Sequence, residues 1–157
     1  GKITRLGIIV DADQEIVDSG IEKTKSDLQK ILTPHGYTLE NTEHGLVATN
    51  NDGLIDIGIW IMPDNKSDGT IEDWIKSKIL SSETTLFNHA CRTVHELTNK
   101  KFSQNSIAKA EIATWLAWQN QPGRTIAYAL KDGEELLDIN HESFKDIITW
   151  LKAFFSE

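Results

Sequence analysis

The sequence predicts a single α/β domain over residues 1–157, in which a mostly parallel sheet is flanked by helices and the C-terminal half is helical. Two apolar stretches, 6–10 and 57–62, lack the polar alternation of half-exposed strands, which is typical of strands buried on both faces. A helical pattern over 20–33 lies between them, so the chain begins as a βαβ-like unit. After residue 86, apolar residues recur mainly at helical spacing.

Further elements follow from local patterns. Short strands are expected at 37–39 and 46–49, on either side of a turn at 43–45. Helices are expected from residue 70, over 86–97, over 103–121, briefly before 130, and in the tail. In the tail helix, the spacing predicts that Phe144, Ile148, Leu151 and Phe155 are buried.

Composition narrows the class of protein. A chain of 157 residues with 39% hydrophobic content can bury a genuine core. Its formal net charge of −8 repels phosphate backbones, so a nucleic-acid enzyme would need metal ions and a local basic patch. A lone cysteine, Cys91, excludes an internal disulfide and a cysteine-based zinc cluster. No apolar run reaches the roughly 18 residues of a membrane span, and no signal-like segment is present, so a cytoplasmic location without membrane partners is expected.

Acidic residues follow both apolar strands. Asp11 and Asp13 end the first, and Asp64 follows the second within Pro63-Asp64-Asn65. Parallel neighbouring strands would bring these acids to the edge of the sheet where open α/β folds bind ligands. Carboxylates suit Mg²⁺ or Mn²⁺. The alternative is that aspartates at strand ends cap helices or begin turns.

The helix expected from Thr70 adds one more candidate ligand. Thr70 and Asp73 form a capping-box pattern, so Glu72 is the preferred metal ligand of the two acids. The alternative is that Glu72 only stabilises the helix dipole. Lys109 and Arg124 are candidate phosphate contacts, although solvated charges are the more ordinary role of such residues.

Four segments, 7–13, 57–65, 69–73 and 109–123, occur together in this order. The set resembles a family of small prokaryotic Toprim-like proteins of unassigned function, and the resemblance covers nearly the whole chain. It implies a Toprim-like, Rossmann-like fold. Toprim domains occur in topoisomerases, primases and nucleases of the overcoming-lysogenization-defect type, where a strand-end glutamate and a later DxD motif bind Mg²⁺ for phosphoryl transfer. Asp11 and Asp13 match the DxD pair; Asp64, Asn65, Glu72 and Asp73 match the small family's own motifs.

One part of the Toprim pattern is missing. Its glutamate belongs to a strand that precedes the DxD strand, and only five residues precede Leu6. We therefore expect either that this strand lies upstream of Gly1 or that the chain lacks it. In the second case the general acid/base of the family mechanism is absent.

Two functions follow from these observations. The first is a metal-dependent, nuclease-like phosphoryl transferase acting on nucleic acid, in which Asp11, Asp13 and Asp64 hold Mg²⁺ or Mn²⁺. The second is a non-catalytic, degenerate Toprim-like module that binds a protein or a nucleotide. The paired acid-tipped strands favour the first function, whereas the acidic charge and the missing glutamate favour the second.

Overall fold

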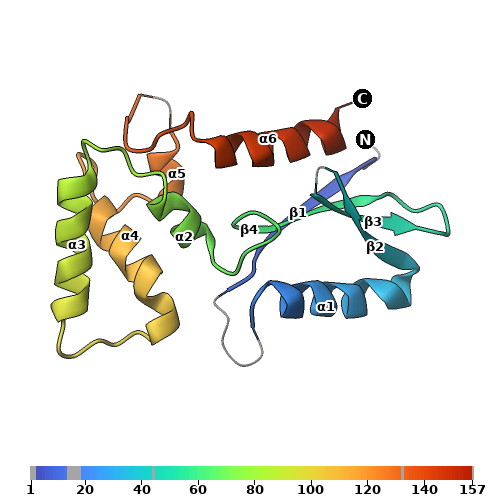
Figure 1. Cartoon of the computed structure of the whole chain (residues 1–157), viewed down its shortest axis with the longest axis horizontal. Coiled ribbons are helices and arrows are strands. Elements are labelled where there is room, and N and C mark those ends of the chain that lie inside the picture. Colours follow the sequence, from blue (N-terminus) through green and yellow to red (C-terminus); the bar gives the residue numbers. More distant parts are fainter. Residues whose placement is uncertain (1–2, 14–18, 44, 132, 157) are drawn as a thin grey trace. The chain divides into compact units, whose positions relative to one another are not determined.

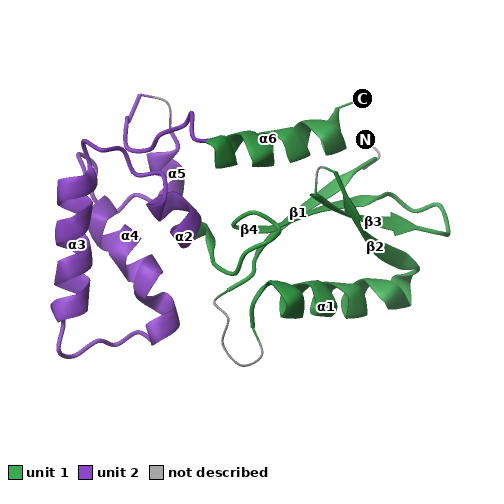
Figure 2. Cartoon of the chain, viewed as in Figure 1, with its two compact units in different colours: residues 1–71, 142–157 green, residues 72–141 purple. Residues whose placement is uncertain are grey.

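The chain contains two compact units. The computed structural model describes residues 3–13, 19–43, 45–131 and 133–156 (Figure 1). Unit 1 comprises Gly1–Ile71 and Glu142–Glu157, and unit 2 comprises Glu72–His141 (Figure 2). Unit 1 carries the sheet, and unit 2 is built mainly from helices.

The sheet of unit 1 has four strands in the order β1-β4-β3-β2. Their bounds are Leu6–Asp11 for β1, Tyr37–Thr42 for β2, Gly45–Asn50 for β3 and Ile57–Met62 for β4. β1 and β4 are parallel, with Leu6 opposite Ile57, whereas β2–β3 and β3–β4 are antiparallel. The α/β class is thus correct, but the sheet is mixed. A short turn joins β2 to β3, and such a connection allows only antiparallel pairing.

Helix α1 (Ile21–Leu32) covers one face of this sheet, close to the predicted bounds. Isoleucines 57, 59 and 61 of β4 join Leu46, Ala48, Ile21 and Leu32 in one buried cluster. A single 3-10 turn, η1 (Thr33–His35), follows α1 and leads into β2. The prediction of burial on both faces is confirmed for β4, whose six residues are all buried. It is wrong for β1, where Ile9 is 53% exposed, because β1 is an edge strand.

Helix α6 (Glu142–Phe155) lies over the opposite face of the sheet (Figure 1). Two glycines permit its close approach: a Cβ on Gly58 would stand 2.7 Å from the Phe154 ring, and one on Gly7 would stand 2.8 Å from Phe155. Trp150 is 2% exposed and tilts against Trp60 with ring centroids 5.7 Å apart.

The buried stripe of α6 differs from the predicted one. Phe144 is buried as expected, but Ile148, Leu151 and Phe155 are 44%, 40% and 43% exposed. Apolar residues cover a broad face of this helix, so spacing alone left more than one buried stripe possible within that face. The structure selects the stripe with the largest ring, Trp150, because it buries the most apolar area.

Unit 2 is assembled from helices and short connections. Its elements are α2 (Ile71–Lys76, whose first residue belongs to unit 1), α3 (Thr84–Glu96), η2 (Gln104–Ser106), α4 (Ile107–Ala117) and α5 (Ile126–Ala129). Helices α3 and α4 pack against each other, and Trp115 is fully buried at this contact beside Phe87. Glu83, immediately before α3, accepts hydrogen bonds from Trp115 Nε1 at 3.0 Å and Gln119 Nε2 at 2.8 Å. The described helices include none with the length and apolar character needed to cross a bilayer.

The packing of α6 predicts different costs for two neighbouring truncations. Trp150→Ala should lower the free energy of unfolding by about 3–5 kcal/mol, because it empties a fully buried site. Leu151→Ala should cost less than about 1 kcal/mol, since its side chain is substantially exposed. Urea denaturation of both variants measures the difference; equal losses would contradict the observed orientation of α6.

Candidate functional site

Hydrogen bonds connect the end of β1 to residues 69–71, at the start of α2. Asp11 Oδ1 accepts a hydrogen bond from the backbone N–H of Ile71 at 2.9 Å, at the first residue of α2. Two residues later, Asp13 adopts a left-handed backbone with φ 61°, and its carbonyl accepts from Gly69 N–H at 2.7 Å. Asp11 therefore satisfies an N–H group that the start of a helix would otherwise leave unpaired.

Asp64 organises a turn after β4. Its Oδ1 accepts from the backbone N–H groups of Lys66 and Ser67 at 2.9 and 2.7 Å, and its Oδ2 from Ser67 Oγ at 3.0 Å. Burial by itself would raise the pKa of Asp64, but these hydrogen bonds outweigh it and hold the pKa below its ordinary value. The carboxylate is thus ionised, and both of its oxygens already accept hydrogen bonds.

A further aspartate, which the sequence patterns did not single out, holds α1. Asp68 Oδ1 accepts from the backbone N–H of Ile21 at 2.6 Å. The residue before α1 is Gly20, which has no side chain to cap the helix. A cap supplied from 47 positions away leaves no local signal in the sequence.

The predicted metal ligands do not gather into one site. Among the described residues, no three His, Cys, Asp or Glu side chains form a group that could hold a metal ion. The expected convergence of Asp11, Asp13 and Asp64 is therefore not seen among the described residues; the carboxylates of Asp11 and Asp64 accept hydrogen bonds from different backbone segments.

The other candidate residues belong to unit 2. Glu72 is 5% exposed, and its carboxylate lies 3.6 Å from Lys109 Nζ. Arg124 directs Nε and Nη2 to the side-chain oxygen of Gln121, at 3.0 and 2.5 Å. Both candidate phosphate contacts therefore have partners within their own unit.

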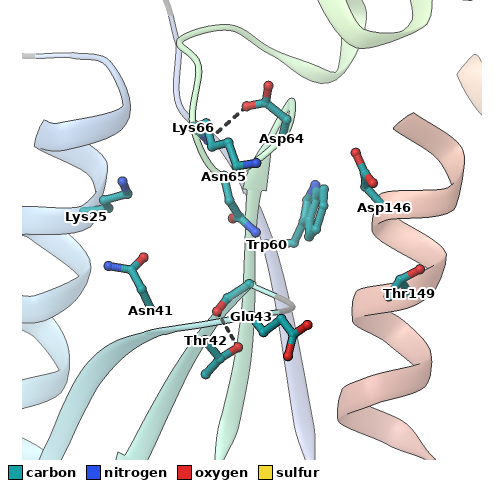
Figure 3. A pocket seen from close by; sticks show the side chains of 11 residues that line it. Lys25, Asn41, Thr42, Glu43, Trp60, Asp64, Asn65, Lys66, Asp146 and Thr149 are labelled. Atoms are coloured by element: carbon teal, nitrogen blue, oxygen red, sulfur yellow. Dashed lines mark hydrogen bonds between the residues drawn. The ribbon is translucent and has the colours of Figure 1, made fainter. Parts of the chain in front are cut away.

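A cavity of about 580 Å³ opens in unit 1 at the carboxyl end of β4, beside the β2–β3 turn (Figure 3). Five separate segments of the chain line it. The lining residues are Lys25, Asn41, Thr42, Glu43, Gly45, Trp60, Asp64, Asn65, Lys66, Asp146 and Thr149. Its position fits the general rule that open α/β sheets bind ligands beyond the carboxyl ends of their strands.

The charges around this cavity come from opposite sides. Lys25 projects from α1, whereas Asp146 and Thr149 project from α6 on the other side (Figure 3). Lys66 and Asp64 lie between them, in the turn after β4. The cavity therefore offers ammonium groups to an anion and carboxylates to hydrogen-bond donors.

Two side-chain N–H groups at this cavity are buried without an acceptor among the described residues: Trp60 Nε1 and Asn65 Nδ2. The orientation of the Asn65 amide is fixed, since its Oδ1 accepts from Ile61 N–H at 2.6 Å and must face β4. An unpaired buried donor costs about 1–3 kcal/mol, so such groups are rare unless something satisfies them.

The sequence did not reveal this cavity. Trp60 fell within an apolar strand and read as core, and Asn65 entered only as part of a resembling motif. The one usable signal was Pro63-Asp64-Asn65, a polar break after a fully apolar strand, which marks the strand's carboxyl end.

Family comparison places the chain in a group without an assigned function. The chain belongs to the DUF3226 family, whose model, described as a protein of unknown function, matches residues 1–156. Comparison with curated proteins and with solved structures gave no significant match.

Unit 2 contains a polar cluster, formed by Lys76, His95 and Glu111, that the sequence patterns did not predict. Glu111 is 3% exposed, and its carboxylate lies 2.6 Å from Lys76 Nζ and 2.8 Å from His95 Nε2. Burial would raise the pKa of Glu111, but the hydrogen bonds from Lys76 and His95 outweigh it and lower the pKa below its ordinary value. Burial, reinforced by Glu111, raises the pKa of the Cys91 thiol, which disfavours the reactive thiolate.

The Glu111 cluster predicts a pH-dependent stability. A folded-state pKa below the ordinary value of 4.5 means that the contribution is complete above that value and is lost as the pH falls through the folded pKa. Glu111→Gln should lower the free energy of unfolding at pH 7 by about 1.5–3 kcal/mol and flatten its decline in acid. Urea denaturation between pH 7 and 3 measures this, with the exposed Glu22→Gln as control. An unchanged acid slope in Glu111→Gln would refute it.

Proposed function

We propose that unit 1 is a nucleotide-binding module with a Toprim-like fold. The observation that carries this proposal is the cavity at the carboxyl end of β4. Small-molecule sites commonly enclose about 300–1,000 Å³, so its volume of about 580 Å³ is adequate for a nucleotide. The aspartates near this sheet edge support the fold around it, which favours binding over the chemistry of a three-acid metal centre.

The lining chemistry favours a ligand that combines an anion with hydroxyl or amino donors. Lys25 and Lys66 can attract phosphate oxygens, although Lys25 also pairs with Glu22 at 3.1 Å. Asp146 and Glu43 can accept hydrogen bonds from ribose hydroxyls or from the amino group of a base. A bare anion would meet these carboxylates unfavourably, whereas a nucleotide has complementary groups for both sides.

A second candidate is metal-dependent phosphoryl transfer on nucleic acid, with Mg²⁺ or Mn²⁺ at Asp11 and Asp13. The observation favouring it is that both residues are held at the end of β1 by hydrogen bonds to the 69–71 segment. Mg²⁺ often uses only one or two carboxylates and takes its remaining ligands from water and substrate phosphates. Two aspartates would then suffice without Asp64 or Glu72.

Nucleotide binding predicts a concentration-dependent rise in melting temperature with AMP or ADP, because a ligand that binds only the folded state stabilises it. Lys25→Met with Lys66→Met should reduce this rise several-fold while preserving both aliphatic stems. The matched control is Lys100→Met with Lys152→Met, which leaves the cavity unchanged. Differential scanning fluorimetry up to millimolar nucleotide measures both effects. A wild-type curve that does not move would refute nucleotide binding.

The metal candidate makes a separate prediction. If Asp11 and Asp13 hold a cation, Mn²⁺ should raise the wild-type melting temperature, and the double variant Asp11→Asn, Asp13→Asn should lose this response. The double variant should remain folded, because the amide oxygen introduced by Asp11→Asn can still accept from Ile71 N–H. Thermal melts with and without millimolar Mn²⁺ decide the matter: no shift in the wild type would end the phosphoryl-transfer proposal.

A further inference from the structure

We propose that Trp60 and Asn65 are specificity-determining residues of the unit 1 cavity, which hold an oxygen of the ligand's phosphate group through their side-chain N–H groups. This inference rests on the proposed function and adds to it the group that the cavity selects. It is carried by two N–H groups that are buried at the cavity and lack an acceptor among the described residues.

Both groups are held by the fold. Trp60 is 4% exposed and lies in the central strand β4, where its ring tilts against Trp150. Asn65 cannot rotate its amide without breaking the 2.6 Å hydrogen bond from Ile61 N–H to its Oδ1. The side chains are therefore organised before any ligand arrives, which lowers the entropy lost on binding.

A third N–H group lies nearby. The position where a Cβ on Gly45 would stand is 3.1 Å from Asn65 Nδ2 and 3.5 Å from Trp150 Nε1, and Trp150 Nε1 also has no acceptor among the described residues. Gly45 itself lines the cavity. A side chain at this position would also clash with Trp150 Cδ1, which would stand only 2.8 Å from the Cβ, so glycine allows Trp150 and Asn65 to pack closely against this turn.

The chemistry of these groups selects an acceptor. Indole and amide N–H groups only donate, so a partner rich in lone pairs satisfies them best. A water molecule would satisfy one donor but bring two hydrogens that need acceptors of their own. A phosphate oxygen brings only lone pairs and negative charge, and Lys66 lines the same cavity.

The carboxylates do not exclude a phosphate from this position. Asp64, the acid nearest in sequence to Asn65, already accepts hydrogen bonds from Lys66 and Ser67. Asp146 belongs to α6, on the side of the cavity opposite Lys25 (Figure 3). These acids are available to the sugar or the base, and the N–H groups are available to the phosphate.

The test compares the binding of AMP and adenosine by isothermal titration calorimetry with the full chain. Trp60→Phe deletes one N–H and keeps an aromatic ring; Asn65→Asp keeps the acceptor for Ile61 N–H and replaces the donor by an oxygen. Hydrogen bonds to charged groups are worth about 10- to 100-fold in affinity, so each variant should bind AMP at least about tenfold more weakly. Trp74→Phe, which alters a buried tryptophan of unit 2, should bind AMP like the wild type.

The controls separate this inference from the function beneath it. Trp60→Phe should remain folded, because the loss of an unpaired buried donor offsets part of the packing that is lost with the smaller ring. AMP affinity unchanged in both variants would overturn the role of Trp60 and Asn65 but leave nucleotide binding standing, whereas no AMP binding by the wild type would overturn both. If neither variant folds, the wild type decides: adenosine binding as tightly as AMP would overturn the inference.

Discussion

The burial of every residue of β4 is the constraint on which the rest of unit 1 depends. This strand lies between β1 and β3, and α1 and α6 cover its two faces (Figure 1). Its odd-numbered residues join the core beneath α1, while Gly58 lets α6 approach the other face closely. Because burying a charged side chain is costly, charged side chains follow β4 and do not occur within it. The turn after Met62 and the cavity beside it lie where β4 ends.

Three aspartates of unit 1, Asp11, Asp64 and Asp68, accept hydrogen bonds that stabilise the fold. Asp11 accepts a hydrogen bond from the first residue of α2, and Asp68 accepts one from the first residue of α1. Asp64 accepts hydrogen bonds from backbone N–H groups in the turn after β4. Each contact satisfies backbone N–H groups that the fold would otherwise leave unpaired. The unsatisfied groups at the cavity are instead N–H donors. Their presence is why we assign recognition of an acceptor-bearing ligand to this region, with the carboxylates contributing mainly to the scaffold.

The sequence predicted those features that depend on local patterns. Strand β4 and helix α1 appeared within one residue of their observed bounds, since uninterrupted apolar runs and a proline–glycine stop are local signals. The mixed sheet was not predicted, although the turn expected at 43–45 already implied antiparallel pairing of β2 with β3; no local pattern indicates that β3 then pairs with β4. The buried face of α6 was predicted wrongly: Trp150 is buried and Leu151 is substantially exposed. Packing of the helix against Gly7 and Gly58 decides which stripe is buried, and the sequence of the helix does not contain that information. The cavity draws residues from five segments, so no single pattern could predict it.

Mapping backbone amide chemical shifts by NMR while AMP is added tests the central claim most directly, that unit 1 binds a nucleotide at the carboxyl end of β4. We expect saturable shifts at residues that line the cavity, among them Lys25, Asn41, Trp60, Lys66 and Thr149, with little change in the helices of unit 2. Shifts confined to unit 2, or no saturable shifts at millimolar AMP, would contradict it.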